Sequence, residues 1–194
     1  MYDQETIDPP TVLDALLNDT RALGFTMACE LQTGSFLRSL AASKPKGNFL
    51  EIGTGTGVGT AWLLAGMDAD SRLVTVDIDA AAANIAKRHL GHDSRVTFHI
   101  MDGAEFLQSA ARGQFDLVYA DAWPGKFSDL DSALSLLKIG GFYFVDDLLP
   151  QASWPAGHAP RVPALIAQLT RRPGFVSTAL AWSSGLMLLV RTND

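Results

Sequence analysis

The sequence predicts an α/β fold in which N-terminal helices precede a doubly wound, mostly parallel sheet of seven strands that ends in an antiparallel hairpin. Short runs rich in Val, Ile and Phe alternate with helix-like segments, which is the pattern of parallel strands joined by right-handed helical crossovers. The 194 residues suffice for one domain with a sizeable core. Hydrophobic residues make up 47 % of the chain and charged residues 19 %, a balance that argues against a disordered chain.

The first 46 residues are expected to be helical, because apolar residues such as Leu13, Leu16, Leu37 and Leu40 recur at helical spacing. Lys44-Pro45-Lys46-Gly47 then indicates a helix stop. Five strands are expected to follow, over residues 48–52, 73–76, 96–101, 115–120 and 142–145. The segments between them contain good helix formers and end near glycines, and they predict helices over residues 59–65, 80–90, 104–112 and 130–138.

The last fifth of the chain has a different character. Four prolines between Pro150 and Pro163 indicate a loop, and a helix is expected over 164–171. Two strand-like runs, 176–182 and 186–191, flank Ser183-Ser184-Gly185, which is a hairpin signal. We therefore expect one domain with a helical lead-in (1–46), a ligand-binding core (47–147) and a substrate-side segment of loop, helix and hairpin (148–194).

Charge and composition favour small-molecule chemistry. The formal net charge is −6, from 15 Lys and Arg against 21 Asp and Glu, whereas nucleic acids and anionic membranes attract basic surfaces. Cys29 is the only cysteine, so the chain offers no internal disulfide and no multi-cysteine zinc cluster. The acidic N-terminus lacks an apolar signal region, and no run of 18 apolar residues occurs, so we expect a soluble, cytoplasmic protein.

The most informative segment runs from Phe49 to Thr60, where a strand enters a turn with glycines at alternate positions and then a helix. Glycines there allow close approach of a ligand to the backbone and positive φ angles, and four of them exceed what a tight turn needs. A phosphate-binding P-loop would need a lysine, but none occurs between Asn48 and Ala86. The dinucleotide pattern Gly-x-Gly-x-x-Gly fails as well, whether it is started at Gly53 or at Gly55.

The segment resembles the acidic-x-Gly-x-Gly-x-Gly motif of class I (Rossmann-like) methyltransferases that depend on S-adenosylmethionine, and this resemblance implies that cofactor. Asp77 ends the second strand, where the family binds the ribose hydroxyls with a carboxylate; helix capping is the alternative, although Asp79 fits that role better. Asp102 is similar to the residue that meets the adenine amine, with an N-cap as its alternative. The cofactor-binding residues that the resemblance implies are Glu51, Gly53, Thr54, Gly55, Gly57, Asp77, Ile78, Asp102, Gly103 and Asp121.

Three acidic residues follow the next two strands of the predicted sheet. Asp121 comes after the fourth strand, and Asp146 and Asp147 come after the fifth. Because the carboxyl ends of parallel strands meet at the ligand-binding crevice, we expect these three side chains to lie together. Either one carboxylate then stays protonated or a cation neutralises the group, and oxygen ligands of this kind suit Mg²⁺, Mn²⁺ or Ca²⁺. The alternative is that they are loop caps and solvated carboxylates.

This arrangement resembles the catechol-type and caffeoyl-CoA-type O-methyltransferases, whose metal is held by an Asp after the fourth strand and an Asp-Asn pair after the fifth. Asp121 and Asp146 match that pattern, while Asp147 stands where the family usually has Asn. The family's catalytic lysine corresponds to Lys126, which is displaced here by Pro124-Gly125. Lys126 could act as a general base with Asp121 beside it if cationic charge nearby depressed its pKa, and a surface lysine is the alternative.

The resemblance covers most of the chain and leaves residues 150–163 unaligned. It implies a methyltransferase that acts on oxygen of a small, hydroxylated and aromatic or catechol-like substrate, with a divalent cation. Two alternatives stay open: a metal-independent methyltransferase with a nitrogen or another oxygen acceptor, and a non-catalytic domain that only binds S-adenosylmethionine. A homodimer is expected from the family alone. The sequence does not predict which molecule accepts the methyl group.

Overall fold

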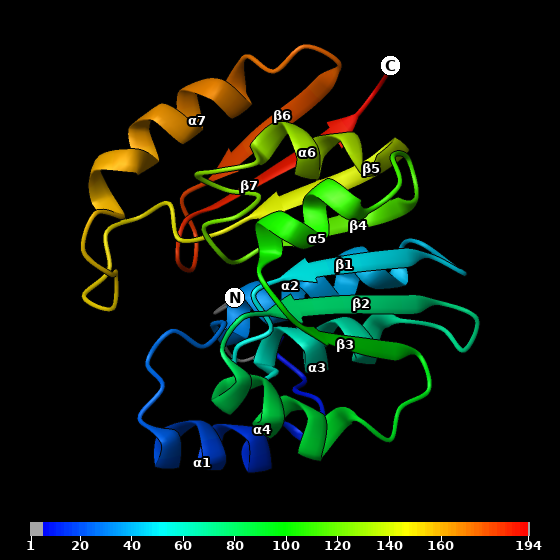
Figure 1. Ribbon diagram of the computed structural model, residues 1–194, viewed down its shortest axis with the longest axis vertical. Coiled ribbons are helices and arrows are strands. Elements are labelled where there is room, and N and C mark those ends of the chain that lie inside the picture. Colours follow the sequence, from blue (N-terminus) through cyan, green and yellow to red (C-terminus); the bar gives the residue numbers. More distant parts are fainter. Residues whose placement is uncertain (1–5, 194) are drawn as a thin grey trace.

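A computed structural model describes residues 6–193 of the chain. Its sheet has seven strands in the order β3-β2-β1-β4-β5-β7-β6 (Figure 1). The first five are parallel, and β7 is antiparallel to both of its neighbours. This confirms the predicted fold class. The strands are β1 (Asn48–Ile52), β2 (Arg72–Asp77), β3 (Val96–Ile100), β4 (Phe115–Ala120), β5 (Leu137–Val145), β6 (Phe175–Leu180) and β7 (Leu186–Arg191).

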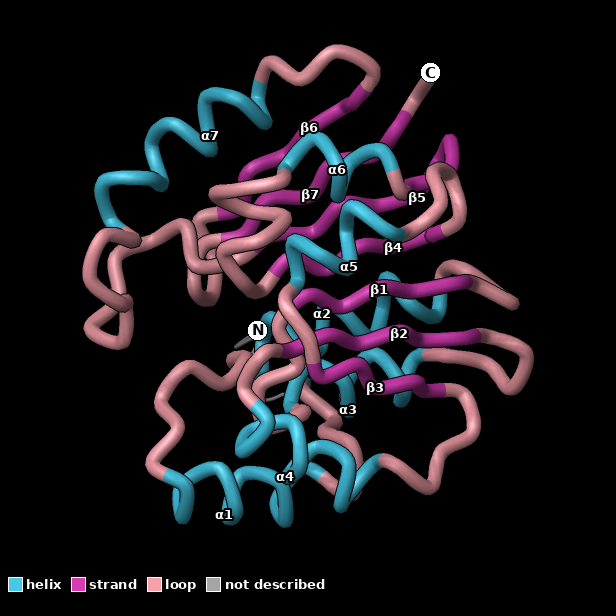
Figure 2. Tube along the Cα trace, in the orientation of Figure 1, coloured by secondary structure: helices cyan, strands magenta, loops and turns pink. Residues whose placement is uncertain are grey.

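Helices cover both faces of this sheet, and Figure 2 separates the three kinds of structure by colour. In Figure 1, α5 and α6 lie in front of the sheet and α2 and α3 behind it. One face carries α1 (Leu13–Leu23), α2 (Leu31–Ala42), α3 (Val58–Gly66) and α4 (Ala80–Leu90). The other face carries α5 (Gly103–Ser109), α6 (Leu130–Ser135) and α7 (Val162–Thr170), and a short 3₁₀ turn, Ala159–Arg161, precedes α7.

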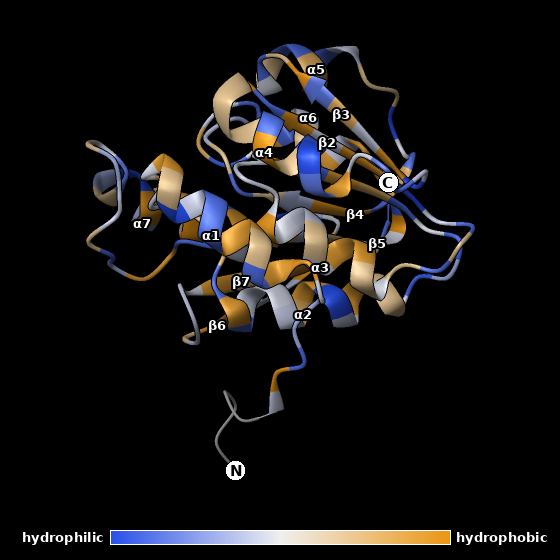
Figure 3. Ribbon diagram, turned by 90° about the horizontal axis from the view of Figure 1, so that it is seen from below, coloured by the Kyte–Doolittle hydropathy of each residue, from blue (hydrophilic) through white to orange (hydrophobic). Residues whose placement is uncertain are grey.

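The two hydrophobic cores follow from the alternation of side chains along the strands. Phe49 of β1 and Leu117 of β4 pack on the side of α1 to α4, whereas the next residues, Leu50 and Val118, pack on the side of α5 to α7. All four are fully buried. Figure 3 shows the apolar strands enclosed between the layers of helices. Central strands with both faces covered therefore read as continuous apolar runs in the sequence.

The predicted boundary between the sixth helix and the fifth strand is wrong. The helix expected over 130–138 ends at Ser135, and β5 begins at Leu137 rather than at Phe142. Leu137 pairs with Phe115 of β4 before the register shifts, so this leucine, which continues the helical pattern, belongs to the strand. Gly140, which suggested a stop, lies inside β5 with a φ of +77°. Tertiary pairing thus overrides the local helical period here.

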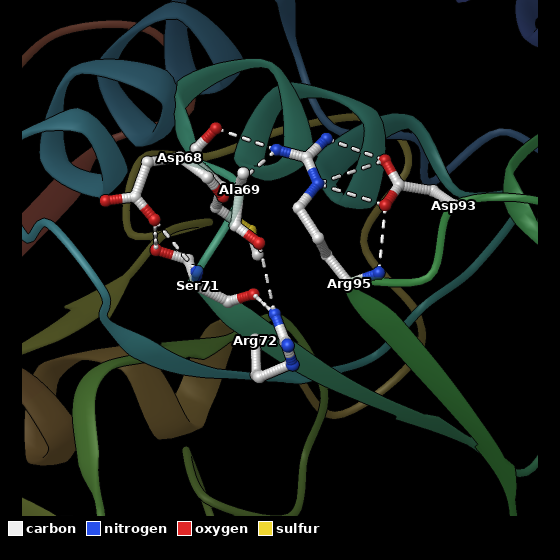
Figure 4. Close-up of polar contacts among 7 residues, drawn as sticks. Asp68, Ala69, Ser71, Arg72, Asp93 and Arg95 are labelled. Atoms are coloured by element: carbon white, nitrogen blue, oxygen red, sulfur yellow. Dashed lines mark hydrogen bonds and ion pairs between the residues drawn. The ribbon is translucent and has the colours of Figure 1, made fainter.

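The edge of the sheet opposite the carboxyl ends is held by loop contacts (Figure 4). Arg95, just before β3, donates to the Asp93 carboxylate at 2.6 Å and to the Met67 carbonyl at 2.7 Å. Asp68 accepts from the backbone and the hydroxyl of Ser71 in the turn before β2. These contacts fix the amino ends of β2 and β3 and leave the other edge to the ligand. Between residues 6 and 193, the structure has no helix that is both long and apolar enough to cross a bilayer.

Candidate active site

A cavity of about 500 Å³ lies at the carboxyl ends of β1, β2 and β4. This position is the topological switch point, because the chain leaves β1 toward β2 on one side and returns to β4 on the other. We call it the main cavity. Most of the residues predicted to bind the cofactor line it: Gly53, Thr54, Gly55, Asp77, Ile78, Asp102, Gly103 and Asp121.

The glycine loop after β1 forms one wall of the main cavity. Gly53 has a φ of +104°, and a Cβ atom there would lie 2.5 Å from the Asp121 carbonyl oxygen, so no other residue fits. The Gly55 amide donates to Asp77 Oδ2 at 2.6 Å, which ties the loop to the end of β2. The loop therefore presents its backbone to the cavity in a fixed conformation.

Two aspartates at the strand ends also shape the helices that follow them. Asp79 caps α4 by accepting from the Ala81 and Ala82 amides, which leaves Asp77 at the cavity wall as predicted. Asp102 caps α5 by accepting from the Ala104 amide at 2.7 Å, and it lines the main cavity as well. Its two predicted roles are thus compatible in this structure.

Glu51 and Gly57 differ from the expectation, because neither lines the main cavity. Glu51 is fully buried beneath the loop, where its Oε2 accepts from the hydroxyls of Thr75, at 2.6 Å, and Thr60. Burial raises the pKa of the Glu51 carboxyl to about 8, against the opposing effect of these hydrogen bonds. A Cβ at Gly57 would lie 2.7 Å from that of Ala86, so this glycine lets α3 and α4 pack closely. Both act on the loop from outside the cavity.

The three predicted acidic residues converge as expected. Asp121, Asp146 and Asp147 each place one carboxylate oxygen within 4.8 Å of the others, and we call them the acidic triad. Asp147 has a φ of +59°, a left-handed conformation that Asp and Asn adopt more readily than most residues. Asp146 is 2 % exposed, and its Oδ2 accepts from the Tyr119 hydroxyl at 2.6 Å.

Lys126 reaches the same cluster in spite of its displacement in the sequence. Its side chain is 2 % exposed, and its Nζ lies 3.1 Å from Asp146 Oδ1 and 3.8 Å from Asp147 Oδ2. A surface lysine is thereby excluded. Burial alone would lower the pKa of Lys126, but the charges of the triad, led by Asp146, outweigh it and raise this pKa. The depressed pKa that a general base needs is therefore not found.

Burial and neighbouring charges shift the pKa values of two members of the acidic triad. Burial, together with the charge of Asp146, raises the pKa of Asp121 well above its usual range. Burial also raises the pKa of Asp147, with Lys126 opposing this effect. Two effects thus act on the like-charge repulsion within the triad: the nearby Lys126 cation, and the raised pKa values of Asp121 and Asp147.

The structure brings three ring side chains to the site: His158, to which the sequence assigned no role, and Trp123 and Trp154, loop residues that the sequence offers either as walls for an aromatic substrate or as core lids. His158 is 3 % exposed and lines the main cavity, with its Nε2 3.0 Å from the Asp147 carbonyl oxygen. Its ring stacks on that of Trp154 at 4.5 Å between centroids. Trp123, 37 % exposed, lies at the cavity wall with the Arg161 guanidinium 4.8 Å over its ring. The signal for Trp123 and Trp154 in the sequence was their place in loops on the carboxyl side of the sheet, and that for His158 was its place in the proline-rich segment.

Comparison with known proteins agrees with this geometry. A family model described as a methyltransferase domain matches residues 50–148, about half of the chain. A catechol O-methyltransferase of Mycobacterium tuberculosis is 28 % identical over 199 residues, which cover 95 % of this chain and 90 % of that protein. Another, from Niastella koreensis, is 28 % identical over 70 % of this chain and 66 % of its own length.

The fold likeness extends over nearly the whole chain. The crystal structure of cofactor-bound Rv0187 from MTB matches with a TM-score of 0.83 and 28 % sequence identity, and the match covers 96 % of this chain and 92 % of that one. In this chain the glycine loop and the carboxylates of Asp77 and Asp102 line the main cavity at the carboxyl ends of the seven-stranded sheet. The chain therefore belongs to the methyltransferase domain family and is a class I methyltransferase that uses S-adenosylmethionine.

Proposed function

We propose that this enzyme transfers the methyl group of S-adenosylmethionine to a hydroxyl oxygen of a small aromatic substrate. The observation that carries the proposal is the continuity of the main cavity, which extends from the glycine loop to Lys126 and Asp147 and is walled there by Trp123 and His158. A cofactor and a flat acceptor can thus share one enclosed space. The two relatives described as catechol O-methyltransferases support an oxygen acceptor.

The cofactor-binding roles are part of this proposal. Asp77 accepts hydrogen bonds from the ribose hydroxyls, and Asp102 accepts from the adenine amine. Ile78 is 71 % exposed at the cavity wall and offers an apolar surface to the base. Gly53 and Gly55 allow close approach of the cofactor, with Thr54 and Gly103 beside them. The absence of a lysine from the loop suits a cofactor without phosphate groups.

Methyl transfer from a sulfonium is an in-line displacement: the acceptor oxygen forms a bond to the methyl carbon as the carbon–sulfur bond breaks. Positioning and exclusion of water dominate the rate of such a step. We propose that the buried Lys126 ammonium stabilises negative charge on the acceptor oxygen, and that a carboxylate of the triad, which includes Asp121, takes the proton. Lys126 then acts as a cation rather than as the general base considered from the sequence.

The family resemblance implies a divalent metal ion on the triad. Carboxylate oxygens are suitable donors for Mg²⁺, Mn²⁺ or Ca²⁺, and the three lie close enough together. However, Lys126 Nζ already contacts two of the three residues, and Tyr119 occupies the second oxygen of Asp146. The residues as they stand do not fit a resident divalent ion, so the metal-independent alternative fits this geometry better.

The organisation of the chain is proposed in the same way. Residues 47–147 supply the glycine loop together with Trp123 and Lys126 at the acceptor end of the site, and the segment over 148–194 completes the acceptor end. His158, from that segment, lines the main cavity, and Phe25, from the lead-in over 1–46, lines it beside Gly55 of the glycine loop, which supports a contribution from all three parts. A homodimer and a cytoplasmic location stay predictions.

The test is transfer of an isotopically labelled methyl group from S-adenosylmethionine to panels of catechols, phenols and aromatic amines, with products identified by mass spectrometry. We expect O-methylated catechols or phenols from the wild type, and about tenfold less product from Asp77→Asn when the cofactor is below saturation. Transfer to amines alone would contradict an oxygen acceptor. Cofactor binding without transfer to any panel would favour a non-catalytic domain.

A further inference from the structure

We propose that the Lys126 ammonium is the resident cation of the acidic triad and excludes a divalent ion from it. The proposal deepens the proposed function and rests on it only for the identity of the reaction. It concerns the place between Asp146 and Asp147, where the resemblance puts a metal and the structure puts a lysine. This chain would accordingly need no metal to order its acidic triad.

The first support is the occupation of the carboxylate oxygens. Asp146 Oδ1 accepts from Lys126 Nζ at 3.1 Å, and Asp146 Oδ2 accepts from the Tyr119 hydroxyl at 2.6 Å. Asp147 Oδ1 accepts from Gln151 Nε2 at 2.5 Å, and Asp147 Oδ2 lies 3.8 Å from the same lysine. An ion at these oxygens would have to displace donors that the chain itself supplies.

The second support is the way the backbone holds Lys126 in place. Gly125, with a φ of +84°, precedes it, and a Cβ there would lie 2.8 Å from the Ile52 side chain. The Gly125 carbonyl accepts from the buried Tyr143 hydroxyl at 2.6 Å, and the Lys126 amide donates to the Trp123 carbonyl at 3.1 Å. This turn is the insertion that displaces the lysine in the sequence. It fixes the backbone from which Nζ reaches the triad.

The third support is burial. Lys126 is among the least exposed charged side chains of the described residues, and a lysine is seldom so buried unless it is paired. Because it is covalently attached and already desolvated, it competes with a free ion at a high effective concentration. A divalent ion would also bring its own charge close to the ammonium, and the two would repel each other. Removal of the ammonium should therefore raise the affinity of the triad for a divalent ion.

The test is Mn²⁺ binding to the chelator-treated full chain, followed by electron paramagnetic resonance. We compare the wild type, Lys126→Met and, as a matched control, Lys138→Met, which removes a lysine paired with Asp116 at 2.7 Å away from the cavity. We expect Lys126→Met to bind Mn²⁺ at least about tenfold more tightly than the wild type, a size typical of changes around metal sites. Lys138→Met should match the wild type.

Equal Mn²⁺ affinity of the wild type and Lys126→Met would overturn the proposal, and so would failure of both to bind. Should Lys126→Met not fold, the nitrogen resonance of the Lys126 ammonium, assigned by its absence in Lys126→Arg, replaces it. We expect a slowly exchanging signal that saturating Mg²⁺ leaves unchanged, and a shift or loss of this signal would contradict the proposal. Neither readout involves methyl transfer, so failure here is distinguishable from failure of the proposed function.

Discussion

Replacing Glu51 with Gln removes a buried carboxyl group that the structure holds in its protonated form. Its pKa is raised from 4.5 to about 8, chiefly by burial, and Glu51 Oε1 has no hydrogen-bond partner among the described residues. Between pH 4.5 and pH 8, the folded state therefore binds a proton that the unfolded state lacks. The contribution of this proton to the free energy of unfolding is fully present below pH 4.5 and is lost as the pH rises through about 8.

The size of the expected effect on stability follows from the difference between the unfolded and folded pKa values of Glu51. Each pH unit inside the window lowers the free energy of unfolding by about 1.4 kcal/mol. From pH 5.5 to pH 7.5 the wild type should lose about 2.5 kcal/mol relative to Glu51→Gln, which carries no titrating group at this position. The amide also changes the hydrogen bonding with Thr60 and Thr75, but that cost does not depend on pH. The slope of the free energy of unfolding against pH therefore reports the titration of the Glu51 carboxyl group, whereas the absolute stability also includes the changed hydrogen bonds.

The assay is urea denaturation followed by circular dichroism at several pH values. Glu105→Gln serves as the control, because it makes the same chemical change at an exposed position in the first turn of α5. We expect the wild type and the control to lose stability in parallel, and Glu51→Gln to lose less. Parallel curves for all three proteins would show that Glu51 is ionised in the folded state and would contradict the raised pKa of its carboxyl group.

Three further substitutions test other parts of the structure. Asp77→Asn should weaken S-adenosylmethionine binding about tenfold or more in calorimetry, because hydrogen bonds to a charged group contribute about 1.5–3 kcal/mol; an unchanged Kd would contradict its role. Gly34→Ala places a methyl group against the Trp62 ring and should cost about 1–3 kcal/mol of stability, so an unaltered Tm would count against this packing. Thr20→Val removes the buried hydroxyl contact with Thr56 at 2.7 Å and should cost about 1 kcal/mol in chemical denaturation, whereas no change would show that the contact is dispensable.

The sequence predicts the fold well where burial is strongest. The ranges expected for β1, β4, α4 and β7 match the structure to the residue, because buried strands and a capped, glycine-terminated helix leave clear local patterns. The start of β5 was mispredicted, since its pairing with β4 is invisible to a local helical period. The five leucines and alanines within residues 130–138 do not tell which neighbour they will pack against, and only the assembled sheet decides this.

The site was predictable in its outline and not in its details. Asp121, Asp146 and Asp147 lie together, as expected, because the carboxyl ends of parallel strands meet at the same edge of the sheet. The burial of Lys126 depends on a turn whose path is set by contacts distant in the sequence, among them the Tyr143 hydroxyl. The position of Glu51 beneath the loop, away from the cavity, depends likewise on which side of β1 each residue faces. Motif spacing identifies such residues but does not give their orientation.

Isothermal titration of S-adenosylmethionine into chelator-treated protein, with Asp77→Asn as the comparison, tests whether the main cavity binds this cofactor. We expect the cofactor to bind to the wild type without added metal, with an affinity that Mg²⁺ leaves unchanged and that is weaker in the variant. No binding to the folded wild type would contradict the assignment of the main cavity to this cofactor, and with it the proposed methyl transfer.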